Sequence, residues 1–498
     1  MVDCPSLVYV SQRPMTTSLT TRQRYALGQA QRKHVARTEH AGWQPQLRHA
    51  DPLHLLAESV RGRVPSLIPI KLDRMAASPF GFFRGAVPVM AYDLSLSPNT
   101  GLHAQLCGDA HVRNLGAFAA PDGRLVFDLN DFDESMRGPF EWDVKRMAAS
   151  LVLAGREAGA KNARCRDAAA AFLASYRTSM HTFAGMPVLE LARYLVHRLH
   201  TVQPIARIFS MAERATPLHS LDALTLPTAD APAGKRSRAT SELPQPSRIF
   251  RSLPPDLTRV HGDVARQVLD SLATYAQSLQ PERRRFLSRY TPLDVAFKIV
   301  GTGSVGLRDY CIYMQGNGAK DPLFLQIKEE TLSAYAPYLG NDDSPHHQGQ
   351  RTVDGQRAMQ LQSDPFLGWT TIEGRDFLVR QLNDHKAAVE MSELKSAGLL
   401  EYASVCGETL ARGHARSGDP AMLAGYIGTS QRFDDAIANF AADYADQTER
   451  DWQALLHSRR HATPTATIKQ PLDADRHRSA KPASAASSTQ VRKKKSRP

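Results

Sequence analysis

The sequence has few cysteines, no long apolar run and no internal repeat, and each absence excludes a class of protein. The cysteines are odd in number and never in CxxC spacing, which argues against a disulfide framework and a structural zinc site and predicts a reducing cytoplasm. They are Cys4, Cys107, Cys165, Cys311 and Cys406. No run of about 18 apolar residues could span a bilayer. The segment 1–13 lacks an apolar stretch of the secretory type, so we expect neither a signal peptide nor a membrane partner.

The formal charge of +12 is concentrated in one segment. Residues 461–498 hold nine Lys and Arg against two Asp, which is +7 of that total. This segment is rich in Ala, Ser and Pro and poor in large apolar residues, so we expect a disordered basic tail. Such a tail can contact polyanions nonspecifically, and we expect no specific nucleic-acid binding.

The length of 498 residues exceeds what a single core usually supports, which predicts two lobes. Changes in composition and periodicity divide the chain into seven segments. They are a weakly ordered extension (1–51), the catalytic-loop half of a large lobe (52–215), a Pro-rich linker or loop (216–255), a helical connection (256–289), a small nucleotide-binding lobe (290–385), C-terminal helices that complete the large lobe (386–460) and the tail (461–498).

Residue periodicity predicts strands and helices in an α+β arrangement, with strands gathered at the front of the second half. The expected strands are Ala104–Cys107, Arg124–Leu129, Ala296–Val300, Asp309–Met314, Leu323–Lys328 and Asp376–Leu382. The expected helices are Trp142–Ala158, Ala163–Phe183, Leu189–His200, Val260–Leu279, Asp354–Gln362, Leu399–Ala415 and Phe433–Leu456.

The densest chemical signal is Cys107-Gly-Asp-Ala-His-Val-Arg-Asn-Leu-Gly116, followed by a strand that carries Asp128. Phosphoryl transfer uses one carboxylate to orient the attacking hydroxyl, and an amide and a second carboxylate to hold Mg²⁺. Asp109, Asn114 and Asp128 have the spacing for these roles. The alternative is an acidic turn, in which Asp131, Asp133 and Glu134 are solvated charges.

A second signal is Val300-Gly-Thr-Gly-Ser-Val-Gly-Leu-Arg308 between two expected strands. Gly301, Gly303 and Gly306, with Ser304 between them, would let backbone N–H groups approach phosphate oxygens. Lys328 follows at the end of an apolar strand, where it either contacts the phosphates or belongs to a solvated face. Its expected acidic partner is Asp354 on a following helix. Glu329 and Glu330 are the other candidates.

These motifs resemble the bacterial family called domain of unknown function 2252 over residues 50–455. The family is similar to the kinase-like superfamily that includes aminoglycoside and choline phosphotransferases. The resemblance is carried by the stretches Arg74–Gly85, Cys107–Gly116, Phe127–Glu134, Gly138–Arg146, Val300–Arg308 and His414–Asp419.

The resemblance implies a two-lobed kinase-like fold, with a small antiparallel-sheet lobe and a larger, mainly helical lobe. It implies that Asp109 is the catalytic aspartate, that Asn114 and Asp128 bind Mg²⁺, and that Asp143 anchors the loop. The glycine loop and Lys328 would bind phosphates, with Asp354 as the helix acid. The catalytic loop precedes the glycine loop, the reverse of the usual order, which implies a circular permutation. Because Leu-Asn follows Asp128, Asp131 or Asp133 could be the metal ligand instead.

Other residues in these stretches have two interpretations each. His111 is a metal ligand or, as we expect, a hydrogen-bonding scaffold. Arg74 and Arg84 flank Phe80, Phe82 and Phe83, and either contact an anionic ligand or form salt bridges on a packed helix.

We therefore expect a kinase-like phosphotransferase that uses ATP and Mg²⁺ and an unknown hydroxyl acceptor, either a small molecule or a protein. One alternative is a non-catalytic nucleotide-binding regulator. Another is a metal-dependent phosphoesterase, which the sequence disfavours because it lacks a Gly-Asn-His-Asp/Glu element and a downstream His-x-His.

Overall fold

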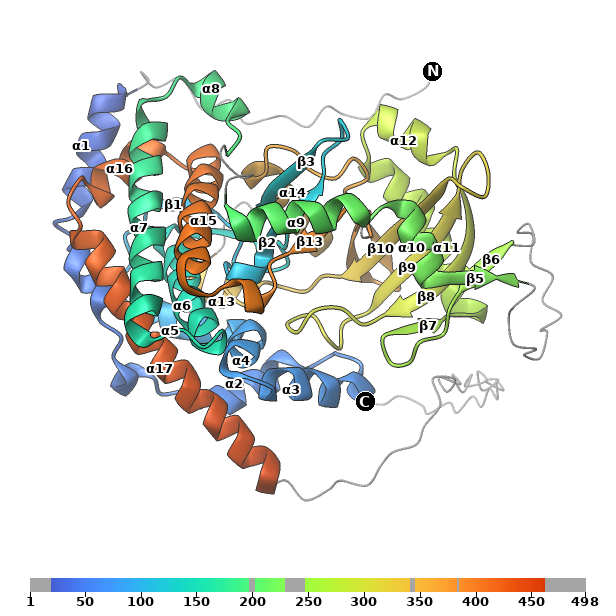
Figure 1. The fold of residues 1–498 in the computed structure, drawn as a ribbon, viewed down its shortest axis with the longest axis horizontal. Helices are drawn as coiled ribbons and strands as arrows, with labels where there is room; N and C mark the ends of the chain where they lie inside the picture. The colour runs from blue at the N-terminus through green and yellow to red at the C-terminus, as the bar shows by residue number, and fades with distance from the viewer. Residues whose placement is uncertain (1–18, 197–201, 229–246, 341–344, 383–384, 462–498) are drawn as a thin grey trace, which may run out of the picture. The chain divides into compact units, whose positions relative to one another are not determined.

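The computed structural model describes residues 19–196, 202–228, 247–340, 345–382 and 385–461 (Figure 1). One compact unit extends as far as Leu456, and the residues from His457 belong to a second unit. The expected basic tail lies outside the described residues, apart from His461. None of the described helices is both long and apolar enough to cross a membrane.

The described chain is mixed α+β, as predicted. Its helices are α1 (Thr21–Gln31), α2 (Pro52–Ser59), α3 (Ile68–Ala76), α4 (Pro79–Gly85), α5 (Val87–Ser95), α6 (Glu141–Glu157), α7 (Asn162–Gly185), α8 (Val188–Arg193), α9 (Gln203–Arg214), α10 (Pro217–Leu224), α11 (Gly262–Ser278), α12 (Pro281–Leu287), α13 (Ala336–Leu339), α14 (Gln348–Met359), α15 (Ser396–Ser417), α16 (Pro420–Ile427) and α17 (Arg432–His461). Its strands are β1 (His103–Leu106), β2 (Leu115–Ala119), β3 (Leu125–Leu129), β4 (Met136–Pro139), β5 (Thr225–Pro227), β6 (Arg248–Phe250), β7 (Leu257–Arg259), β8 (Thr291–Lys298), β9 (Asp309–Gln315), β10 (Pro322–Glu329), β11 (Gly368–Ile372), β12 (Arg375–Gln381) and β13 (Ala387–Ala388).

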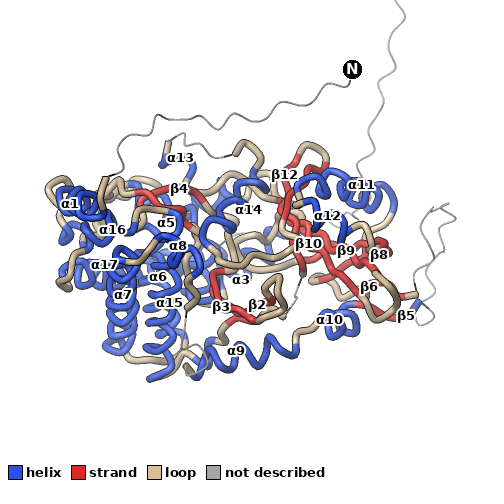
Figure 2. The backbone as a smooth tube through the Cα atoms, turned by 90° about the horizontal axis from the view of Figure 1, so that it is seen from above, coloured by secondary structure: helices blue, strands red, loops and turns tan. Residues whose placement is uncertain are grey.

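The largest sheet has six strands in the order β11-β12-β10-β9-β8-β7, and every neighbouring pair is antiparallel. Figure 2 shows these strands grouped together, with α11 and α12 beside them. Side chains alternate between the two faces of a strand. On β10, Leu325 and Ile327 therefore pack with Val268 and Tyr275 of α11 in one apolar cluster.

The opposite face of β10 carries Gln326 and Lys328, both buried. Lys328 lies opposite Asp309 of β9 and Leu378 of β12 in the ladder. Helix α14 covers this face, since Val353 clusters with Leu378. This face is therefore the one that meets the loops described below.

Two smaller sheets position those loops. β1 pairs with β4, and β13 and β3 flank β2, all antiparallel. The loop Cys107–Asn114 leaves the end of β1 and enters β2, and the loop 130–135 leaves the end of β3 and enters β4. The two loops thus emerge from the ends of paired strands.

The helical part has the largest apolar cluster, built around α6, α7 and α15. Trp142 lies in this cluster, as predicted. The close approach of α1 to α16 depends on two glycines. A Cβ on Gly28 would lie 1.9 Å from Met422 O, and one on Gly425 would lie 2.1 Å from Tyr25 O.

The strongly periodic segments were predicted to within a few residues, and the weak ones were not. The extension 1–51 was predicted to be weakly ordered. Within it, residues 1–18 lie outside the described chain, but α1 packs on α16. The linker 216–255 was predicted to lack structure, yet it contains α10 and the paired strands β5 and β6. The expected helix Leu189–His200 ends at Arg193, before residues that the structure does not describe.

Candidate functional site

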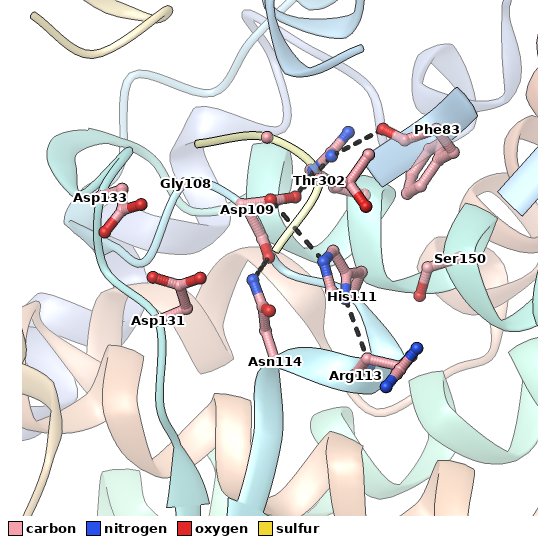
Figure 3. Close-up of polar contacts among 12 residues, drawn as sticks. Phe83, Gly108, Asp109, His111, Arg113, Asn114, Asp131, Asp133, Ser150 and Thr302 are labelled. Carbon is pink, nitrogen blue, oxygen red and sulfur yellow. Dashed lines mark hydrogen bonds and ion pairs between the residues drawn. The ribbon is translucent and has the colours of Figure 1, made fainter. Parts of the chain in front are cut away.

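Residues far apart in the sequence line one cleft with about 620 Å³ of space, part of it open to solvent. They come from the loop Cys107–Asn114, the loop after β3, the glycine loop between β8 and β9, the end of β10 and the segment 63–87. Those that line it are Arg63, Arg84, Val87, Asp109, His111, Asn114, Asp131, Asp133, Glu134, Gly301, Thr302, Gly303, Ser304, Leu307, Glu330 and Thr331. Figure 3 shows the three aspartates and Asn114 around one space, with Thr302 beside Asp109.

The backbone before Asp109 is fixed by a glycine and an aspartate. Gly108 has φ 82°, and a Cβ on it would lie 2.1 Å from Glu134 O, so only glycine fits. The carboxylate of Asp143, on α6, accepts the N–H groups of Cys107 and Gly108 at 2.8 and 3.0 Å. His414 of α15 lies 3.3 Å from the same carboxylate. Asp143 therefore has the anchoring position that the resemblance implied.

Asp109 is held in the cleft by a buried arginine. Its Oδ1 accepts a hydrogen bond from Arg146 Nε at 2.8 Å. The guanidinium of Arg146 also stacks over the ring of Phe83 and donates to Phe83 O at 3.1 Å. Burial raises the pKa of Asp109 to about 6, against the opposing effect of Arg146. A carboxylate of this kind suits a general base near neutral pH.

His111 is a scaffold residue in this structure. Its Nδ1 accepts the N–H of Arg113 at 3.2 Å. Burial lowers the pKa of His111 well below its usual value, and Arg84 and Arg146 lower it further. The neutral ring therefore has its proton on Nε2, which lies 3.7 Å from Asp109 Oδ2.

Asn114 and Asp131 lie on the same cleft as Asp109. The amide nitrogen of Asn114 donates to Asp109 O at 2.7 Å, so the amide oxygen is the atom available to a cation. The Oδ1 atoms of Asp131 and Asp133 are buried without a hydrogen-bond partner in the described chain. Burial and Asp131 raise the pKa of Asp133, whereas Lys328, Arg380 and Lys386 outweigh burial and lower that of Asp131.

Asp128 does not line the cleft, contrary to the prediction that it is a metal ligand. It is buried in β3, and its carboxylate forms an ion pair with Arg412 of α15. Asp128 is the next-to-last residue of β3 and alternation turns its side chain into the core, whereas Asp131, three residues later, lies in the loop after the strand. Of the two alternatives for the metal ligand, the geometry favours Asp131.

Lys328 is buried and has partners that differ from the predicted one. Its Nζ forms an ion pair with Asp133 and lies 3.8 Å from Asp131 Oδ1. Asp354, the expected partner, is exposed on α14 and accepts a hydrogen bond from Gln350. No local pattern indicated that the loop after β3 would reach Lys328 before the helix could.

The glycine loop is held from its outer side by basic residues of the segment 63–74. Arg63 donates to Gly303 O at 2.8 Å and to Val305 O at 2.7 Å. Lys71 donates to Gly303 O at 2.7 Å, and Arg74 donates to Gly301 O at 2.5 Å. The N–H groups of Thr302, Gly303 and Ser304 make no hydrogen bond within the described part of the chain. The carbonyl oxygens of the loop are thus bound by basic residues, while these three N–H groups have no acceptor among the described residues.

Three basic residues near the loop have no ion pair with a carboxylate among the described residues, namely Arg63, Lys71 and Arg84. Burial and, to a smaller extent, the charge of Arg63 lower the pKa of Lys71 to about 7. Burial also lowers the pKa of Arg84, whose Nε has no hydrogen-bond partner. Unneutralised buried cations favour a nearby anion. Arg84 was a candidate from its aromatic context, whereas Arg63 and Lys71 had no local signal.

Over the described ranges, no three or more His, Cys, Asp or Glu side chains are arranged to hold a metal ion. Asn114 is an amide and does not count toward such a group. Asp131 and Asp133 are two carboxylates, and a group needs three.

Comparison with known proteins gives one match. A family model for uncharacterized proteins conserved in bacteria, DUF2252, matches residues 63–458. No curated protein and no solved structure matches the chain.

Proposed function

The chain belongs to the DUF2252 family of proteins conserved in bacteria, and we propose that it is a kinase-like phosphotransferase that moves the γ-phosphoryl group of ATP to a hydroxyl acceptor. The observation that carries the proposal is the meeting, in one cleft, of the glycine loop with Asp109, Asn114 and Asp131. These are the residue types that phosphoryl transfer requires.

The order of elements in the six-stranded sheet supports a kinase-like small lobe in a permuted chain. In protein kinases the glycine loop lies between the first two strands, and the phosphate-binding lysine lies on the third. Here the loop lies between β8 and β9, and Lys328 lies on the next strand, β10. Helix α14 and strands β11 and β12 follow. The catalytic loop comes almost 200 residues earlier in the chain, which is the permutation in this proposal.

The phosphates of the nucleotide would lie under the glycine loop. Free backbone N–H groups on a glycine-rich turn form an anion-binding concavity. The uncompensated charges of Arg63 and Lys71 behind the loop favour the same anion. Lys328 does not itself line the cleft, but its Nζ pairs with Asp133, which does, and Lys328 would exchange this carboxylate for a phosphate oxygen.

The residues of the cleft fit Mg²⁺. This ion prefers oxygen ligands, keeps several waters and takes one or two carboxylates together with substrate phosphates. Asp131 Oδ1 and Asp133 Oδ1 are buried and lack hydrogen-bond donors among the described residues. Asp131 and Asn114 would hold the ion, with Asp133 beside them. A bound Mg²⁺ would neutralise charge on the phosphates, and the small number of protein ligands agrees with that role.

Asp109 would orient the acceptor and accept its proton. The acceptor oxygen bonds to the γ-phosphorus, the bond to the ADP oxygen breaks, and the hydroxyl proton passes to Asp109. Arg146 occupies Oδ1, so Oδ2 is the oxygen that faces the acceptor. Most of the rate enhancement would come from positioning and from charge stabilisation.

Calorimetric titration of Mg-ATP tests the nucleotide site. We expect micromolar, Mg²⁺-dependent binding to the wild-type protein. Binding should weaken about tenfold or more, ~1.4 kcal/mol, in Lys328→Met and in Asp131→Asn. Asp354→Asn, an exposed change outside the cleft, is the matched control and should bind like the wild type. Absence of binding to the wild-type protein, with or without Mg²⁺, contradicts the proposal.

Turnover distinguishes an enzyme from a nucleotide-binding regulator. Slow Mg²⁺-dependent hydrolysis of labelled ATP, with water as the acceptor, should be lost in Asp109→Asn, while that variant still binds Mg-ATP. Equal hydrolysis by Asp109→Asn and the wild type, or binding with no hydrolysis by either, would argue for the regulator.

A further inference from the structure

Arg84 lies between the two loops that the proposed reaction needs. It is in the last turn of α4, directly after Phe83, whose carbonyl oxygen accepts a hydrogen bond from Arg146. Its own main-chain oxygen lies 3.4 Å from where a Cβ on Gly303 would stand. The end of α4 is therefore fixed both to the arginine that holds Asp109 and to the glycine loop.

The side chain of Arg84 lines the cleft but has no partner in the described chain. No hydrogen bond or ion pair involves it, and its Nε is buried. Asp109, Asp131 and Glu157 act on Arg84 only as charges at a distance. Arg84 is half-buried, and a buried donor such as its Nε is costly to leave without an acceptor, so a ligand that accepts from it would be favoured.

The other cations around the cleft already have specific contacts. Arg63 and Lys71 hold carbonyl oxygens of the glycine loop. Arg146 holds Asp109, and Lys328 holds Asp133 and Asp131. Of these five cations, Arg84 can therefore take a ligand without giving up a contact.

Arg84 lines the cleft together with Asp109 and His111. Arg113, which is exposed, lies next to His111 in the loop Cys107–Asn114. Asp131 and the glycine loop are also neighbours of Arg84. Arg84 therefore lies between Asp109, where the acceptor would bind, and the proposed nucleotide site.

We infer that the acceptor is a small hydroxyl compound that carries its own carboxylate or phosphate group, and that Arg84 binds this group. Guanidinium binds both anions through two parallel hydrogen bonds, which would fix the hydroxyl relative to Asp109. Arg113 draws the anion toward the cleft. The inference rests on the proposed phosphotransferase function and names its substrate class.

A binding experiment separates this inference from the proposed function. The protein is first saturated with Mg²⁺ and a non-hydrolysable ATP analogue, and inorganic phosphate or malonate is then titrated calorimetrically. We expect a second anion to bind, about tenfold or more weakly in Arg84→Gln than in the wild type. The affinity of the analogue should change by less than about threefold in the same variant. Comparison of phosphate with malonate shows which of the two anions the site prefers.

Control variants distinguish a folding defect from a binding defect. Arg84 makes no hydrogen bond, so Arg84→Gln and Arg84→Lys should keep the wild-type melting temperature. Arg84→Lys should retain more anion binding than Arg84→Gln, because it keeps the charge. Arg137→Gln removes a surface arginine outside the cleft and should bind like the wild type.

The possible results distinguish failure of this inference from failure of the proposed function. Binding of the analogue without a second anion overturns the inference and leaves the proposed function intact. Loss of analogue binding in Arg84→Gln, with anion binding kept, assigns Arg84 to the nucleotide and also overturns it. No binding of the analogue to the wild type is the failure of the proposed function itself. In an acceptor screen with labelled ATP, glycerate and glycerol phosphate should be labelled faster than neutral glycerol.

Discussion

Lys328 of β10 forms an ion pair with Asp133 in the loop that follows β3. The pair joins strands that are almost 200 residues apart, and Arg351 of α14 reinforces it by donating to Asp133 O at 2.7 Å. The ammonium group thus occupies the same carboxylates that would hold a divalent cation. In the proposed function, nucleotide, cation and lysine would therefore be linked through one pair of aspartates.

The first prediction follows from this competition. In Lys328→Met the carboxylates of Asp131 and Asp133 lose their cation, so Mg²⁺ alone should raise the melting temperature more than it does for the wild type. Thermal unfolding at increasing Mg²⁺ concentration measures the effect. A smaller rise in the variant than in the wild type would show that the ion binds elsewhere. Asp354→Asn should respond to Mg²⁺ as the wild type does.

The second prediction separates the two aspartates that the sequence left as alternatives. Asp128→Asn leaves Arg412 buried without its carboxylate, so we expect a loss of about 3–5 kcal/mol in the free energy of unfolding. Its affinity for Mg-ATP, measured below its melting temperature, should remain near the wild-type value. Asp131→Asn should show the reverse, with little loss of stability and Mg²⁺-dependent binding that is about tenfold or more weaker. Denaturant unfolding and calorimetry on the same two variants decide the matter.

The third prediction concerns pH and the buried network on the cleft face of the sheet. Asp309 accepts a hydrogen bond from Gln326 at 2.7 Å, and burial raises its pKa to about 7. The folded state therefore holds a proton that the unfolded state releases near pH 4, so this group stabilises the fold at low pH and stops doing so as pH rises to 7. The change is up to about 1.4 kcal/mol per pH unit.

Asp309→Asn should remove this contribution to the pH dependence. Relative to the wild type, the variant should gain stability between pH 4.5 and 7.5, as measured by urea unfolding. Asp263→Asn, at an exposed side chain of α11, is the control and should leave the slope unchanged. A variant that loses stability over the same range would contradict the assignment.

The fourth prediction tests the turn before Asp109. In Gly108→Ala, positive φ and the approach to Glu134 O act together, and we expect a loss of at least about 2 kcal/mol. Gly123 has nearly the same φ, 81°, but nothing lies within 4 Å of its Cβ position. Gly123→Ala should therefore show the conformational strain alone, about 1 kcal/mol. Equal losses in the two variants would mean that the contact with Glu134 is unimportant.

Local pattern was enough for the elements that carry their own signal. The alternation of apolar residues identified β9 and β10, and the spacing of Gly108, Asp109 and Asn114 identified the loop that β1 and β2 hold. These features depend on a few consecutive residues, and so a single sequence contains them. The α+β class followed from the grouping of strands.

Contacts between segments that are far apart in the chain could not be predicted from the sequence alone. Helix α1 has no strong apolar stripe, and its order comes from packing on α16, almost 400 residues later. The partner of Lys328 was expected on the nearest helix, but chain distance does not limit an ion pair in a folded protein. Asp128 and Asp131 differ only in strand alternation and in the residue at which β3 ends, and strand ends are the least certain part of such predictions.

Arg63, Lys71 and Arg74 donate hydrogen bonds to carbonyl oxygens of the glycine loop, and these bonds limit how the loop can move. A loop that lifts by itself would break these hydrogen bonds together and would leave buried cations and acceptors unsatisfied. The opening movement that costs the least free energy is therefore a rigid rotation in which α3 moves together with β8, β9 and the turn between them. A bound nucleotide would then exchange through the gap that this rotation makes against the loop Cys107–Asn114.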